Sequence, residues 1–158
     1  MKKVMSMLMV LVMCLSLCAC GGNELTAAKV EEALADCNGT LNMETSGDKV
    51  TSFTYVVEGV NAEDLVDKAY SRKAIANVLS GDTSKITLGQ VKVSKAIAPL
   101  MKIEVLFNGD SDNFDANAFV EKILGIICDG NTAEYDGWVV TAEVDQASDS
   151  ILIKAVSK

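Results

Sequence analysis

The chain has 158 residues, with 22 acidic and 14 basic side chains, a net charge of −8 and no histidine. Nucleic acid and anionic lipid repel such a chain, so nucleic-acid binding is disfavoured. Without histidine, Ser-His-Asp and Cys-His catalytic arrangements and every histidine-containing zinc site are excluded.

The first 19 residues have the pattern of an export signal. Lys2 and Lys3 precede an apolar run from Val4 to Ala19. This run is shorter than the roughly 20 residues of a membrane-spanning helix. We therefore expect a cleaved signal peptide, with an uncleaved single-pass anchor as the alternative.

The end of this segment resembles the lipobox of bacterial lipoproteins, on the evidence of Leu17, Ala19 and Cys20. Cys18 departs from that pattern, because alanine or serine is usual there. The resemblance implies cleavage after residue 19 and a lipid on Cys20, and two acyl chains anchor a protein stably where one does not. It also implies a location on the outer face of the bacterial cytoplasmic membrane, or in the envelope of a two-membrane bacterium. Residues 20–23 form a short tether, so we expect a domain within roughly 10–15 Å of the bilayer.

Residues 24–158 are enough for a single globular domain with its own core. Cys37 and Cys128 are the cysteines that remain after processing and lipidation. An exported protein can form a disulfide, and a bridge across a loop of about 90 residues would nominally stabilise it by 4–5 kcal/mol. Two buried thiols that pack as small hydrophobic side chains are the alternative.

Helices are predicted over residues 27–37, 62–79 and 116–128, where apolar residues recur on one face. Each follows a polar residue that can cap it, flanked by apolar residues at the spacing of a hydrophobic staple. Each also stops at a glycine, which is typical of helix C-termini. The capping residues are Thr26, Asn61 and Asp115.

The remaining segments predict an antiparallel-rich sheet of about five or six strands, with helices packed on one face. This is an α+β fold. The helix–glycine–hairpin order occurs twice, which indicates either a duplicated unit or the same capping rules used twice. Residues 82–99 fit no single pattern. The predicted strands cover residues 40–45, 49–58, 100–107, 132–135, 138–145 and 150–156.

Two groups of side chains are candidates for an interaction patch. Residues 68–103 carry seven basic residues and one acid, so this segment is basic in an otherwise acidic chain. It could face lipid headgroups, an envelope polymer or an acidic partner, or neutralise acidic neighbours within the fold. Tyr135 and Trp138 flank an Asp-Gly turn, either as an exposed aromatic patch or as a cross-strand pair in the core. The basic candidates are Lys68, Arg72, Lys73, Lys92 and Lys95.

These observations predict a membrane-tethered envelope lipoprotein that acts as a non-catalytic binding or interaction module. The partner could be an envelope protein, a polymer or a small ligand. The alternatives are an envelope enzyme, such as a carboxylate-based hydrolase, and a structural subunit of a membrane complex. We expect no cofactor, and no metal site, because the acidic loop 108–115 departs from the calcium-loop signature.

Overall fold

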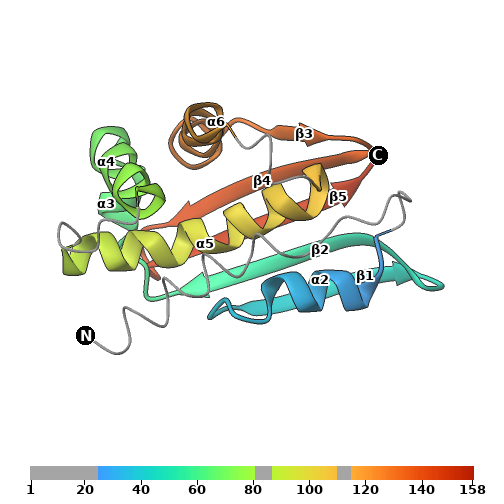
Figure 1. Cartoon of the computed structure of the whole chain (residues 1–158). Helices are drawn as coiled ribbons and strands as arrows, with labels where there is room; N and C mark the ends of the chain where they lie inside the picture. The colour runs from blue at the N-terminus through green and yellow to red at the C-terminus, as the bar shows by residue number, and fades with distance from the viewer. Residues whose placement is uncertain (1–24, 81–86, 110–114) are drawn as a thin grey trace.

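A computed structural model of the protein describes residues 25–80, 87–109 and 115–158. The predicted signal segment and Cys20 lie outside these residues. The described chain forms helices on one side of a five-stranded antiparallel sheet, which confirms the predicted α+β class (Figure 1). The helices are α2 (Ala27–Leu34), α3 (Ala62–Val66), α4 (Lys68–Leu79), α5 (Leu88–Asn108) and α6 (Ala116–Cys128). The strands are β1 (Thr40–Ser46), β2 (Lys49–Glu58), β3 (Ala133–Tyr135), β4 (Trp138–Asp145) and β5 (Ser150–Ser157).

The C-terminal strand β5 lies at the centre of the sheet, whose order is β1-β2-β5-β4-β3. It pairs with β4 along its whole length and with β2 over residues 150–156. In one row across these strands, Tyr55 lies opposite Ile153, and Ile153 lies opposite Ala142. Because side chains alternate between faces, a shift of one residue would turn this whole row away from the core.

The two faces of the sheet differ in burial. On the face under the helices, Phe53, Tyr55 and Ile153 are at most 1 % exposed. They join apolar residues of all five helices in one core cluster. The intervening residues of the same strands point to the opposite face, where Thr54 is half-buried and Val156 is 37 % exposed. One face of the sheet therefore carries the core, and the other faces solvent.

The segment predicted as one helix over residues 62–79 forms two helices, and Asp67 separates them. The backbone of Asp67 is extended (φ −72°, ψ 104°), and its carboxylate accepts hydrogen bonds from the N–H groups of Ala69 and Tyr70. Asp67 is thus the N-cap of α4 and ends α3. The Ser71 hydroxyl donates to the carbonyl oxygen of Leu65 at 2.7 Å and ties the two helices together.

Two of the three predicted helix caps make the expected contacts. The Asn61 side chain accepts from the N–H of Asp64 at the start of α3, and Asp115 accepts from the N–H groups of Asn117 and Ala118 at the start of α6. Thr26 precedes α2 but makes no side-chain capping bond.

The strand predicted over residues 100–107 is wrong, because these residues belong to the long helix α5. Met101, Ile103 and Val105 alternate with charged residues, which is typical of a half-buried strand. The intervening charges, Lys102 and Glu104, are nevertheless both buried. The alternation of apolar and charged residues here therefore does not separate a buried side from a solvent-facing side, as it does in a half-buried strand.

Helix α5 also includes most of the segment that fitted no single pattern. It begins with a capping box, in which the Thr87 hydroxyl accepts from the Gln90 N–H and the Gln90 side chain accepts from the Thr87 N–H. Pro99 lies inside the helix and is buried. It donates no backbone hydrogen bond there, because proline has no N–H.

The two helix–hairpin units lie on opposite sides of β5, with the outer strands β1 and β3 running in the same direction. A rotation that placed β1 on β3 and β2 on β4 would be a half-turn about an axis parallel to the strands. Such a half-turn also exchanges the two faces of the sheet. Helices α2 and α6 nevertheless join the same core on the same face. The arrangement therefore lacks the rotational pseudo-symmetry of a duplicated unit.

Gly39, between α2 and β1, lies against Tyr55. A Cβ at this position would overlap the Tyr55 ring and lie 2.6 Å from the carbonyl oxygen of Val56. The backbone of β2 must then move, so we expect Gly39→Ala to lower the free energy of unfolding by about 1–3 kcal/mol. Denaturant unfolding measures this change. The neighbouring exposed change Asn38→Ala is the control, with an expected effect within about 0.5 kcal/mol, and equal effects of the two variants would contradict the prediction.

Candidate functional site

The structure does not bring the predicted interaction residues together. Tyr135 and Trp138 flank the β3–β4 turn, at the end of the sheet that carries the C-terminus (Figure 1). Helix α4, which carries Lys68, Arg72 and Lys73, lies at the other end. The aromatic pair and the basic segment therefore belong to different surfaces.

Part of the basic segment pairs with acids of α6 and its C-terminus. Lys68 Nζ lies 2.6 Å from a carboxylate oxygen of Asp129, and the Arg72 guanidinium bonds both carboxylate oxygens of Glu121. These hydrogen bonds raise the pKa of Lys68 and lower the pKa of Glu121. Lys68 and Arg72 therefore neutralise charge between α4 and α6.

Lys73, Lys92 and Lys95 form the other part of this segment. Lys73 and Lys92 are exposed and Lys95 is half-buried. Within the described ranges, no carboxylate lies within ion-pair distance of these three lysines. Because α4 packs on α5, these lysines lie at the helical end of the molecule, together with the acids Glu63, Asp64 and Asp67 of α3 and its junction with α4.

Tyr135 and Trp138 are buried in an aromatic cluster, not exposed as a patch. Phe107 from α5 lies between them, with its ring centroid 4.9 Å from that of Tyr135 and 5.3 Å from that of Trp138. Phe53 from β2 lies 6.1 Å from the Trp138 ring. The exposed fractions are 8 % for Tyr135 and 7 % for Trp138. The pair thus joins the sheet to α5 through ring packing.

A buried carboxylate adjoins this cluster. Glu104 of α5 accepts a hydrogen bond from the Tyr135 hydroxyl at 2.5 Å and from the Asn108 side chain at 2.5 Å. Lys122 of α6 places its ammonium 2.7 Å and 3.0 Å from the two Glu104 oxygens, and 4.9 Å from the centre of the Tyr135 ring. Burial and the Glu104 hydrogen bond raise the pKa of Tyr135 well above its ordinary value. Its hydroxyl therefore remains a proton donor to Glu104.

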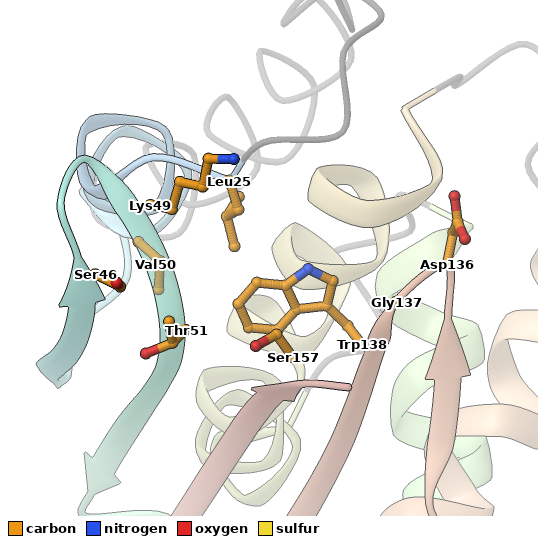
Figure 2. A pocket seen from close by; sticks show the side chains of 9 residues that line it. All are labelled: Leu25, Ser46, Lys49, Val50, Thr51, Asp136, Gly137, Trp138 and Ser157. Atoms are coloured by element: carbon orange, nitrogen blue, oxygen red, sulfur yellow. The ribbon is translucent and has the colours of Figure 1, made fainter.

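An open pocket of about 390 Å³ lies at the end of the sheet, beside Trp138 (Figure 2). It is bounded by the β1–β2 turn, the β3–β4 turn, the end of β5 and Leu25, which lies two residues before α2. In Figure 2 the indole ring lies between β2 and β4, with its nitrogen on the edge that faces the opening. The pocket is lined by Leu25, Ser46, Lys49, Val50, Thr51, Asp136, Gly137, Trp138 and Ser157.

Sequence reasoning selected Trp138 but missed the pocket. Leu25, Val50 and Ser157 line it with Trp138, and they come from three segments far apart in the chain. No local pattern connects these segments. The sequence feature that indicates the location of the pocket is the pair of turns after residues 46 and 135. Antiparallel hairpins place such turns at the ends of a sheet.

Cys37 and Cys128 both carry thiols and do not form the bridge that the spacing allowed. The carbonyl oxygen of Cys37 accepts a hydrogen bond from the Tyr55 hydroxyl, at 2.7 Å. The Cys128 thiol lies 3.6 Å from the carbonyl oxygen of Leu65, and burial raises its pKa. The two half-buried side chains therefore pack among different neighbours.

Across the described residues, no group of three or more acids and cysteines is arranged to hold a metal ion. In the same residues, no helix is long and apolar enough to cross a bilayer. Comparisons with known protein families, curated proteins and solved structures find no match for this chain.

The Glu104 network predicts a large cost for removing its charge. In Glu104→Gln, the Lys122 ammonium and the Tyr135 hydroxyl lose a charged acceptor inside the fold, so we expect unfolding to become easier by about 2–4 kcal/mol. Denaturant unfolding at neutral pH measures the loss. Glu121→Gln is the matched control, because it removes an exposed ion pair of the same chemistry, which contributes much less. Similar losses in the two variants would show that the burial of Glu104 is unimportant.

The buried tyrosines predict a loss of stability in alkali. Burial raises the pKa of Tyr55 from 10.0 to about 12, and the pKa of Tyr135 is also raised. Between about pH 10 and pH 12 the unfolded chain gives up these protons while the folded chain keeps them, so stability falls as pH rises. Denaturant unfolding across this range should show the fall, and Tyr55→Phe should make it shallower. An unchanged slope in Tyr55→Phe would contradict the assignment.

Proposed function

We propose that the protein is a lipid-anchored envelope protein that serves as a non-catalytic binding module, held to the bilayer through Cys20. The lipobox-like residues before Cys20 support the anchor. The observation that carries the proposal is the position of Leu25, because it fixes where the chain enters the fold. The Leu25 carbonyl oxygen accepts a hydrogen bond from the Val50 N–H at 2.8 Å, and Thr26 pairs with Lys49.

Leu25 therefore lies at the end of the sheet that holds the Trp138 pocket and the C-terminus, which we call the anchor pole. Cys20 is five residues earlier, a span of at most about 18 Å in an extended chain. A lipid on Cys20 thus holds the anchor pole against the bilayer. The opposite end, with α3, α4 and the start of α5, is the helix pole.

The two poles are well separated. Strand β2 has 10 residues and helix α5 has 21, and each spans about 30 Å at the usual rise per residue. The helix pole then points away from the bilayer, with Lys73, Lys92 and Lys95 on it. This geometry favours an acidic envelope partner over the headgroups of the anchoring membrane as the target of these lysines.

A non-catalytic binding role also agrees with the hydrogen bonds of the buried carboxylate. Glu104 is the buried acid of the described chain, and its oxygens bond Lys122, Tyr135 and Asn108. A carboxylate-based hydrolase needs a second acid facing the first across a substrate site. The groups that face Glu104 are hydrogen-bond donors, an arrangement that favours a structural role for it.

The anchor is tested by comparing two adjacent cysteines. In cells supplied with an alkyne analogue of palmitate, Cys20→Ser should abolish labelling and release the protein from the membrane fraction. Cys18→Ser is the matched control, and it should keep both the label and the membrane location. Labelling that survives Cys20→Ser would contradict the proposal. The mass of the N-terminal peptide of the mature protein locates the lipid directly.

A further inference from the structure

The Trp138 indole N–H is a hydrogen-bond donor without a partner in the described chain. The side chain is 93 % buried, as its exposed fraction is 7 %, and no described residue accepts from its nitrogen. Figure 2 shows this nitrogen on the edge of the ring that faces the pocket. The nitrogen itself is not among the fully buried side-chain atoms of the described chain that lack a partner, so water reaches it from the pocket when no ligand is bound. The donor is thus placed for an acceptor that enters the pocket.

The surroundings of Trp138 limit what that acceptor belongs to. Phe53 and Phe107 pack against the ring, so it offers no open face on which a sugar could stack. What reaches the pocket is one edge with a single donor. Beside it, Leu25 and Val50 supply apolar wall, and Thr51 and Ser157 supply hydroxyls. Lys49 and Asp136 also line the pocket, so a fitting ligand joins an acceptor oxygen and an apolar segment to a polar or charged group.

The position of the pocket limits the ligand further. It opens at the anchor pole, and Leu25, which lines it, is five residues from Cys20. Tryptophan is enriched at the membrane interface, because its ring is apolar and its N–H meets polar groups there. A volume of about 390 Å³ is at the lower end of the range for ligand pockets, enough for part of a lipid.

We propose that this pocket binds the ester region of a membrane lipid. The indole N–H of Trp138 donates to an ester carbonyl oxygen, and the first methylenes of the acyl chain lie against Leu25 and Val50. The lipid's source in the adjacent bilayer rests on the proposed anchoring through Cys20. This contact fixes the orientation of the domain on the membrane, which a five-residue tether alone does not.

Trp138 is the single tryptophan of the chain, so its fluorescence reports on the pocket directly. The mature lipidated protein is reconstituted in phosphatidylcholine vesicles whose acyl chains carry bromine either next to the ester or near the methyl end. Bromine quenches tryptophan at short range. We expect strong quenching by the ester-side bromine and weak quenching by the methyl-end bromine. No quenching by either lipid, in protein whose Cys20 lipid is confirmed by mass, overturns the pocket proposal alone.

Matched variants separate occupancy of the pocket from mere proximity to the bilayer. Ser157→Phe fills the pocket from its rim and should abolish the quenching, whereas Ser150→Phe, at the other end of β5, should leave it intact. Quenching that persists in Ser157→Phe overturns the proposal.

The pocket can also be tested apart from the anchor. If mass analysis finds no lipid on Cys20, the proposed anchoring fails, and monomeric short-chain phosphatidylcholine is titrated into the full chain instead. A blue shift of Trp138 emission that Ser157→Phe removes then supports the pocket alone. No shift, or a shift produced by soluble cell-wall oligosaccharides in place of the lipid, overturns it.

Discussion

The rest of the structure depends on the pairing of β5 with both hairpins. Ile151, Ile153 and Ala155 of this strand are completely buried, and each lies between a partner in β2 and a partner in β4. Without β5 the sheet would be two separate hairpins, each marginally stable in water. Since β2 precedes β5 by about a hundred residues, the pairing that closes the core is strongly non-local. Such pairings cost loop-closure entropy before they stabilise anything.

Closure by β5 also creates the pocket. The last residues of β5 reach the end of the sheet where both hairpin turns lie, and Lys158 donates its backbone N–H to the carbonyl oxygen of Gly137. Trp138 is held there by Phe53 and Phe107, and Phe107 is in turn positioned by α5. The Glu104–Lys122 pair fixes α5 against α6 on the other side of the cluster. The position of the Trp138 indole ring thus depends on groups from β2, β5, α5 and α6.

Local signals explain what could be predicted. Asn61 and Asp115 were recognised as caps because capping depends on neighbouring residues, and the hairpins were recognised from alternation between turns. The strand expected over residues 100–107 was wrong because burial of Lys102 and Glu104 depends on ion-pair partners distant in sequence. A local signal for α5 did exist in the capping box at Thr87 and Gln90. The Trp138 pocket had none, because its walls meet only when β5 closes the sheet.

The position of the chain entry determines which surfaces a partner can reach. Under the proposed anchoring, a tether of five residues keeps the anchor pole at the bilayer, where a large partner is sterically excluded. The solvent-facing side of the sheet, which carries Thr54 and Val156, runs parallel to the long axis of the domain. The helix pole lies about 30 Å from the anchor pole along this axis. At the helix pole, three lysines that no described acid neutralises lie together with the acids Glu63, Asp64 and Asp67. A partner that binds the helix pole would therefore meet lysines and carboxylates side by side, so complementary charges on that partner would fix its orientation there.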